Sequence, residues 1–190
     1  MMNYSRFNYF IISVIGLLIQ FQLAHASDWE VIKPQSRIGF TAQWEDMPFD
    51  GVFHRYSTTI DFDPASPDTG KFAATIFMAS ADTNDRERDE ALQFPEWFNP
   101  ARFPVAKFTG TTVRAVSANQ YELTGKLTIK NITHDVQIPF VWKQGNGQAS
   151  FSGNTTLDRT LFRVGEGEWL EDQSIHFDVQ VHINLQLRKP

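Results

Sequence analysis

The strongest constraint on the fold is a strict alternation of side chains near the C-terminus. Residues 175–187 place an apolar side chain at every second position, with a polar one between each pair. Successive side chains of a β-strand point to opposite faces, so this pattern predicts a strand with one buried face. The predicted strand is much longer than the usual ~5–6 residues. Such a length favours a tall barrel over a small sandwich.

The same period of two recurs along the chain. Alternating sets lie at 38–44, 72–78, 121–129 and 136–142, and shorter ones lie near 51–62 and 151–157. Segments rich in Gly, Pro, Asn, Asp and Ser separate them at 63–70, 117–120 and 144–147. The sequence therefore predicts an all-β domain of about eight antiparallel strands, as a barrel or a sandwich.

One segment, 82–104, breaks this pattern. It is charged at its start, aromatic at its end and contains three prolines. Asn84 is placed to cap a short helix that runs through Leu92, and residues 95–98 suit a second turn. We expect a helical connection around residues 84–100, packed over one end of the barrel.

The N-terminus carries the pattern of an export signal. Arg6 precedes the apolar run 10–19, and Ala24-His25-Ala26 follows it. The run is shorter than the ~20 residues that span a membrane. We therefore expect a signal peptide over residues 1–26, cleaved after Ala26, and a periplasmic domain over residues 27–190. That domain keeps 16 of the 17 basic residues against 22 acidic ones, a net charge of −6, which argues against a nucleic-acid partner.

The chain offers little catalytic chemistry. It has no cysteine, which excludes disulfides, thiolate metal sites and a Cys nucleophile. The histidines of the predicted domain show no metal-ligand spacing, and phosphate-binding loops and the Gly-x-Ser-x-Gly motif are absent from the sequence. The sequence therefore predicts no metal, no cofactor and no enzyme activity.

Charged groups in loops have two interpretations each. Glu166, Glu168, Glu171 and Asp172 are expected to form an acidic loop at the barrel mouth, although a general acid/base pair is the alternative. The neighbours Asp158-Arg159 and Arg88-Asp89 are expected to form ion pairs that hold the loops down, with gating or headgroup contact as the alternative.

The apolar interior leaves two readings open. A barrel of about eight strands either fills its interior with side chains or encloses one ligand. Small residues fall on the inward faces, among them Ala42, Gly51, Ala74, Gly125 and Gly153. They either leave an open bore or make room for Phe and Trp from other strands.

Several segments, taken in order, resemble one known family. They are 36–40, 49–56, 60–64, 79–83, 88–92, 97–99, 102–108, 121–130, 156–159 and Phe162. Over about Trp29 to Leu187 the chain resembles the YceI-like family of exported proteins. The resemblance implies an eight-stranded, antiparallel, lipocalin-like barrel. It also implies a non-enzymatic protein whose interior holds a long isoprenoid chain, such as a polyprenol or the tail of a quinone.

The chain also departs from the family pattern. Many members have a His on the first long strand, where this chain reads Thr41-Ala42-Gln43-Trp44, and Asn99 replaces a frequent Asp. Residues 165–169 are similar to a subgroup associated with membrane cytochromes of the b561 type. An accessory role beside such a cytochrome or quinone system is therefore one alternative function, with transient membrane contact. A small-molecule enzyme on the same barrel is the other.

The predicted ligand-binding residues follow from the inward faces. The residues expected to line the interior are Phe40, Trp44, Phe53, Ile60, Phe62, Ile76, Met78, Phe108, Leu127, Ile138, Phe140, Phe177, Val179 and Val181. Those expected at the mouth, or in a plug over it, are Phe94, Trp97, Phe98 and Trp169. Ordinary core packing is the alternative for each of them. The sequence leaves a monomer and a homodimer equally open.

Overall fold

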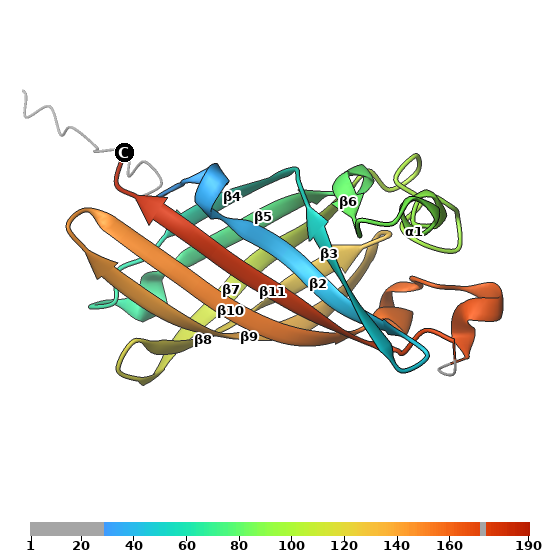
Figure 1. The fold of residues 1–190 in the computed structure, drawn as a ribbon. Helices are drawn as coiled ribbons and strands as arrows, with labels where there is room; N and C mark the ends of the chain where they lie inside the picture. Colours follow the sequence, from blue (N-terminus) through green and yellow to red (C-terminus); the bar gives the residue numbers. More distant parts are fainter. Residues whose placement is uncertain (1–28, 172–173) are drawn as a thin grey trace, which may run out of the picture.

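An antiparallel sheet, curled around a long axis, makes up most of the molecule (Figure 1). The computed structural model describes residues 29–171 and 174–190, so the predicted signal peptide and Asp172 lie outside the described residues. The strands are β1 (Glu30–Val31), β2 (Arg37–Trp44), β3 (Met47–Phe53), β4 (Tyr56–Asp61), β5 (Lys71–Phe77), β6 (Ala81–Asp82), β7 (Val105–Ser117), β8 (Gln120–Ile129), β9 (Ile132–Gly145), β10 (Gln148–Asp158) and β11 (Asp178–Arg188). The all-β, antiparallel prediction is confirmed.

The order of the strands closes the sheet on itself. Hydrogen bonds link them in the order β4-β5-β7-β8-β9-β10-β11-β2-β3-β6, and β1 pairs with β11. The two ends of this path are β4 and β6. Because β6 pairs with β3, and only His54 and Arg55 separate β3 from β4, the chain joins the two ends. The predicted count of eight is close. The described residues form eleven strands, but β1 and β6 have two residues each, and β3 and β4 together occupy one wall position.

Tight turns join the long strands where the sequence supplies residues that tolerate a positive φ. Lys130 and Asn131 turn β8 into β9 with φ of 48° and 62°, and Asn146 and Gly147 turn β9 into β10 with φ of 51° and 74°. Both central residues of a two-residue type I′ hairpin need positive φ. The predicted turn at 144–147 is confirmed.

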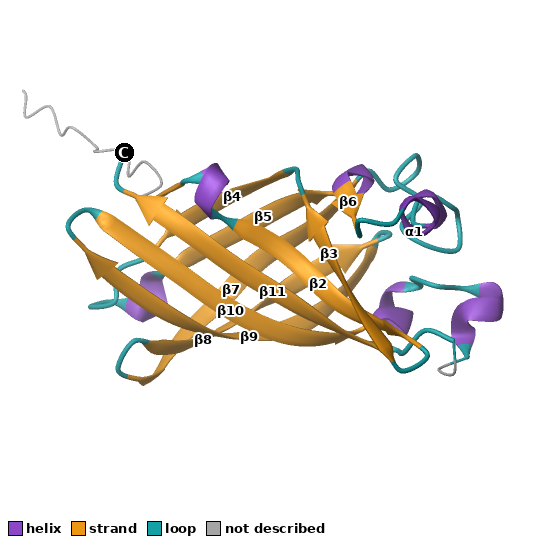
Figure 2. Ribbon diagram, viewed as in Figure 1, coloured by secondary structure: helices purple, strands orange, loops and turns teal. Residues whose placement is uncertain are grey.

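Short helical segments gather at one end of the barrel, which we call the mouth end (Figure 2). They are η3 (Met78–Ser80), α1 (Arg86–Ala91), η4 (Arg159–Phe162) and η5 (Gly167–Leu170), while η1 (Lys33–Gln35) and η2 (Pro67–Thr69) lie away from this end. The predicted helical connection is confirmed, although Asp85, not Asn84, caps α1 by accepting from the Arg88 amide. Within the described ranges, no helix is long and apolar enough to cross a membrane.

The last strand begins later than predicted. Its ladder starts at Asp178, whereas Ile175 makes a single bridge to Trp44. The reason is local, because the carbonyls of Ile175 and His176 accept hydrogen bonds from the Arg159 side chain, and that of Phe177 accepts from the Arg159 amide. These carbonyls therefore accept hydrogen bonds from Arg159 in the mouth loop, and the regular ladder of β11 begins only after them.

Besides the gap between its end strands β4 and β6, the described wall contains a seam between β9 and β10. Their ladder runs from Gly145 opposite Gln148 to Phe140 opposite Gly153 and stops there, although both strands continue toward the mouth end. The next residue of β9 is Pro139, which has no N–H to donate. Beyond it, the Thr155 hydroxyl donates to the Gln137 carbonyl at 2.9 Å.

Aromatic side chains fill the opposite, closed end, where the β7–β8 and β9–β10 turns lie. Trp142 and Phe62 are almost fully buried, and the ring of Phe62 lies 5.0 Å from that of Trp142 and 5.1 Å from that of Tyr121. Phe140 stacks on Phe151 at 4.6 Å. This aromatic core makes the closed end solid.

Candidate functional site

Two adjoining cavities occupy the part of the barrel between the mouth end and the aromatic core. The one nearer the mouth has a volume of about 170 Å³, and the deeper one about 120 Å³. They share wall residues from five strands, namely Ile38, Ile76, Leu127, Leu157 and Val181. Because they share these walls, the two cavities lie end to end, and together we call them the bore.

The walls of the bore are apolar. Arg159 is the only charged residue among the described residues that line it, and the other side chains are mostly aliphatic and aromatic. Apolar surface that a ligand covers here contributes roughly 25 cal/mol per Å² to binding. The bore therefore suits a hydrocarbon chain rather than a polar molecule.

Two glycines keep aromatic rings flat against the wall. A Cβ added at Gly51 would lie 2.2 Å from the ring of Phe40, and one added at Gly125 would lie 2.4 Å from the ring of Phe108. Phe40 and Phe108 both line the bore. The small residues thus make room for rings from adjacent strands, and the bore stays open because those rings lie over glycine. Both readings of the inward glycines are therefore partly correct.

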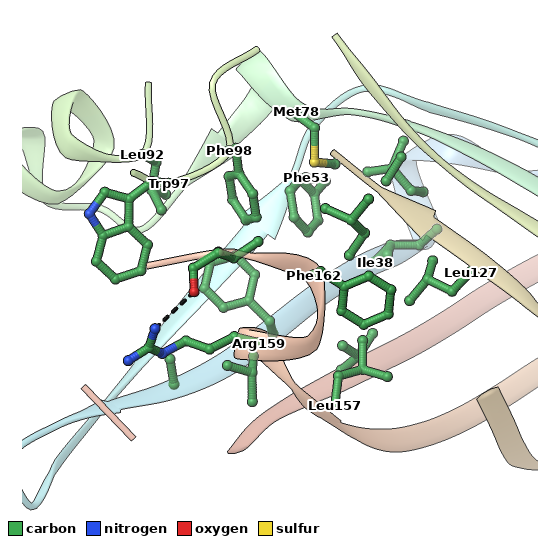
Figure 3. A pocket seen from close by; sticks show the side chains of 18 of the residues that line it. Ile38, Phe53, Met78, Leu92, Trp97, Phe98, Leu127, Leu157, Arg159 and Phe162 are labelled. Carbon is green, nitrogen blue, oxygen red and sulfur yellow. Dashed lines mark hydrogen bonds between the residues drawn. The ribbon is translucent and has the colours of Figure 1, made fainter. Parts of the chain in front are cut away.

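A roof of two segments covers the mouth. Leu92, Trp97 and Phe98 reach the bore from the connection after α1, and Phe162 and Val164 reach it from the η4 segment (Figure 3). The expected position of the connection over one end of the barrel is thereby confirmed.

A buried lysine joins the two roof segments. Lys130, only 8% exposed, donates through Nζ to the carbonyls of Pro95 and Arg163 and pairs with Glu166 at 3.2 Å. The Gly165 and Glu166 amides both donate to the Glu96 carbonyl. Glu166, expected in a free acidic loop, is therefore part of this clamp.

Arg159 organises the mouth loop from inside. Its side chain is buried and donates to the carbonyls of five residues, His176, Val164, Gly165, Trp169 and Ile175. The neighbouring Asp158 has a different task, because it accepts from the amide and hydroxyl of Thr160. The expected ion pair with Asp158 is thus replaced by backbone contacts.

The predicted Arg88–Asp89 pair is also replaced. Arg88 pairs with Asp85 at 3.4 Å, whereas Asp89 accepts from the amide and hydroxyl of Thr83 at 2.8 and 2.7 Å. One turn of helix points neighbouring side chains in different directions, so adjacent charges on α1 find separate partners.

Two titratable groups lie beside the bore. Tyr56 is the ladder partner of Ile76, a bore residue, and burial raises the pKa of Tyr56. Lys33 donates to the Tyr56 carbonyl and lies 3.3 Å from the centre of its ring, and burial lowers the pKa of Lys33. A phenol is already neutral at physiological pH at its ordinary pKa, and burial moves the pKa of Tyr56 further from that range, so Tyr56 adds no charge to the wall.

Twelve of the predicted site residues lie on the walls of the bore. They are Phe40, Phe53, Ile60, Ile76, Met78, Trp97, Phe98, Phe108, Leu127, Ile138, Val179 and Val181. Their contact with a ligand stays a prediction.

The other six lie elsewhere. Phe62 and Phe140 belong to the aromatic core. Trp44 ends β2 and packs on Trp169, which also contacts the bore residue Trp97, so these indoles form a row at the mouth. Phe94 is 56% exposed, and Phe177 lies against the Arg159 guanidinium. Alternation continues past the point where a strand leaves the barrel, which explains Trp44 and Phe177, whereas Trp169 packs on Trp97 at the mouth, where it is predicted.

Some wall residues were missing from the sequence prediction. Leu157, Leu123, Phe72, Phe151 and Leu185 share inward faces with predicted residues, so the period of two already contained their signal. Leu92, Phe162 and Val164 come from irregular segments, where no periodicity marks the inward face. Within the described ranges, no group of three or more His, Cys, Asp or Glu residues forms a metal site.

Comparison with known proteins agrees with this architecture. The model of the YceI-like domain matches residues 29–187. The chain belongs to the YceI-like family. A YceI-family relative described as protein YceI of Salmonella arizonae is 38% identical over 88 residues, 46% of each chain. An uncharacterised relative from Photorhabdus laumondii is 34% identical over 124 residues, which cover 64% of each chain.

Solved structures of YceI-like folds superpose closely on this chain. The crystal structure of Burkholderia cenocepacia BcnA has a TM-score of 0.81 and 29% identity, over 83% of this chain and 99% of that one. A polyisoprenoid-binding domain from Saccharophagus degradans has a TM-score of 0.70 at 13% identity, over 86% of this chain and 99% of that one. The second likeness shows the fold alone.

Proposed function

We propose that this YceI-like protein is a periplasmic binding protein that holds the tail of a polyisoprenoid lipid, a polyprenol or a quinone, in its bore. The proposal rests on the apolar wall of the bore. Among the described residues that line it, the single charged one is Arg159, which donates its hydrogen bonds to backbone carbonyls. The fold is shared with a domain whose structure is described as polyisoprenoid-binding, which supports the same ligand class.

Transfer of the apolar tail from water into the interior of a protein is favourable. Each buried CH₂ contributes about 0.8 kcal/mol, so a chain of several isoprene units partitions strongly out of water. Most of the affinity then lies in the tail, and discrimination between headgroups is weak. Binding of this kind requires no catalytic group, which is why we propose a carrier and not an enzyme.

Lipid extraction tests the proposal. The protein, purified from the periplasm of its own host without detergent, should yield isoprenoid lipid by mass spectrometry, and the emptied protein should bind geranylgeraniol. A purified protein that yields no isoprenoid and binds none would refute the function. Fractionation of the host tests the location and the cleavage after Ala26.

An accessory role beside a membrane cytochrome is the second candidate. The observation in its favour is the row of Trp44, Trp169 and Trp97 at the mouth, of which Trp44 is 39% exposed. This candidate predicts that the protein co-purifies with a b-type cytochrome from gently solubilised membranes. Trp169→Ala should abolish that association and leave tail binding intact, whereas co-purification unchanged by this substitution would contradict the role.

A further inference from the structure

The bore has a floor as well as a roof. Phe72 and Phe151 both line its deeper part, and their ring centres lie 5.9 Å apart. Phe140 stands directly behind them, 4.6 Å from Phe151 and 5.7 Å from Phe72, and it lines neither cavity. Phe72 and Phe151 are therefore the point at which open space ends and the solid aromatic core begins.

The part of the wall formed by β9, β10 and β11 is continuously paired at this level. Phe151 faces Trp142 across the paired part of β9 and β10 and faces Leu185 across β11. The seam lies on the mouth side of Gly153, above the floor. A tail that reaches Phe151 consequently finds neither an axial nor a lateral way onward.

The distance from roof to floor follows from the strands. On β11 the bore runs from Val179 to Leu185, which is about 15 Å along the axis for a rise of ~3.4 Å per residue and a tilt of ~40°. An extended chain advances ~1.1–1.2 Å per backbone bond, so an isoprene unit of four such bonds spans about 4.5 Å. The bore thus encloses about three to four isoprene units.

We propose that Phe72 and Phe151 form a ruler that limits the enclosed tail to about three to four isoprene units, so that the headgroup or the excess tail stays outside the mouth. This inference rests on the proposed function and adds a length limit to it. Affinity rises with each enclosed unit and stops rising when the tail reaches the floor, because a further unit buries no more apolar surface.

A homologous series of prenols tests the ruler on the whole protein. Dissociation constants are measured for geraniol, farnesol, geranylgeraniol, geranylfarnesol and solanesol. We expect at least about tenfold tighter binding per added unit up to geranylgeraniol, and near-equal constants beyond it. Phe151→Ala and Phe72→Ala deepen the bore, so geranylfarnesol should then bind about tenfold more tightly than geranylgeraniol. Phe151→Leu replaces any variant that fails to fold, as judged by near-ultraviolet circular dichroism.

Phe53→Ala is the matched control, because Phe53 lines the bore near the mouth. It should weaken all prenols to a similar degree and leave the length limit where it was. Affinity that keeps rising through solanesol in the unmodified protein overturns the ruler but keeps the proposed function. A length limit that stays the same in folded Phe72→Ala or Phe151→Ala protein also overturns the ruler but keeps the proposed function. Absence of binding for every prenol overturns both.

Discussion

At the residue scale, the bore depends on pairs of one ring and one glycine. The ring of Phe40 lies over Gly51, its ladder partner on β3, and no side chain at position 51 holds it away from the wall. A single methyl group there meets three ring atoms at 2.2–2.9 Å, closer than van der Waals contact allows. The ring must then turn toward the bore, which is the open side.

Gly51→Ala is therefore expected to obstruct the bore without unfolding the protein. Geranylgeraniol binding should weaken at least tenfold, while stability falls by about 1–3 kcal/mol, the usual cost of overpacking. Isothermal titration and urea denaturation measure the two effects. Gly145→Ala is the control, since a Cβ there meets nothing within 4 Å. Unchanged affinity in Gly51→Ala would show that the ring moves elsewhere.

Arg159 illustrates a different use of a single residue. Its guanidinium group donates to the backbone carbonyls of Val164, Gly165, Ile175 and His176. These bonds replace the regular hydrogen bonding that an irregular loop lacks. Each hydrogen bond from a charged donor is worth about 1.5–3 kcal/mol, and a buried carbonyl left without a donor costs about 1–3 kcal/mol.

Arg159→Lys should accordingly destabilise the protein by roughly 3–5 kcal/mol, because an ammonium group reaches fewer of these carbonyls. Urea denaturation gives the free energy of unfolding, and hydrogen exchange should localise the loss to the amides of residues 164–170. Arg163→Lys, at an exposed side chain, serves as the comparison and should change stability by less than about 1 kcal/mol. Equal stabilities for the two variants would contradict this assignment.

At the scale of elements, the seam between β9 and β10 divides the wall into a fixed half and a movable half. The fixed half has a ladder, whereas the half near the mouth has the Thr155–Gln137 hydrogen bond and the contact of His134 with Phe162, whose rings lie 5.1 Å apart. Separating the strands here breaks few backbone hydrogen bonds. We expect the barrel to open along this line when a tail enters.

A disulfide across the seam tests that motion in a chain with no cysteine of its own. Gln137→Cys with Thr156→Cys, two exposed positions that the register of the ladder places opposite each other, should once oxidised slow prenol association at least tenfold, and reduction should restore the rate in the same sample. Val141→Cys with Ser152→Cys, a pair in the laddered half, is the control and should have no effect on the rate. Stopped-flow fluorescence measures association. Equal rates for the oxidised and reduced seam variant would exclude opening at this site.

The elements also show what the sequence predicts well. Alternation identifies the inward residues of β2, β5, β8 and β11, because burial of one face is encoded at every second position. Alternation cannot locate the ends of strands, which is why it predicts Trp44 and Phe177 on the bore. It cannot locate the seam either, because the seam depends on pairing across the sheet. Phe162 and Arg159 act from irregular backbone, where side-chain direction follows from tertiary contacts that no local pattern contains.

At the scale of the whole molecule, the two ends of the barrel differ. Of the large apolar side chains that are exposed in the described part of the chain, Trp44, Met47, Phe94, Leu161 and Leu170 belong to segments at the mouth end, and Val116 lies at the closed end. An apolar rim around the mouth of an apolar bore suits contact with a bilayer, because a tail then passes between the two without crossing water.

Met47→Glu with Leu170→Glu should therefore slow the transfer of a fluorescent prenol from phosphatidylethanolamine vesicles about tenfold or more, since each charge opposes burial of the rim in lipid. Affinity for soluble farnesol should stay unchanged, because neither residue lines the bore. Val116→Glu makes the same chemical change at the closed end and should transfer prenol at the normal rate. A similar slowing in both proteins would show that the rim has no special part.

The pairing of β2 with β11 has a consequence for how the chain acquires its shape. Phe40 faces Val181 in that ladder, so strands from opposite ends of the sequence seal the wall. Until β11 arrives, the other strands form two separate sheets, β4-β5-β7-β8-β9-β10 and β2-β3-β6, whose unpaired edges invite association with other chains. Contacts between such distant segments form slowly. Loss of β11 is therefore expected to leave open sheets that associate with other chains, and not a smaller barrel. The barrel forms only when β11 pairs with both of its neighbours.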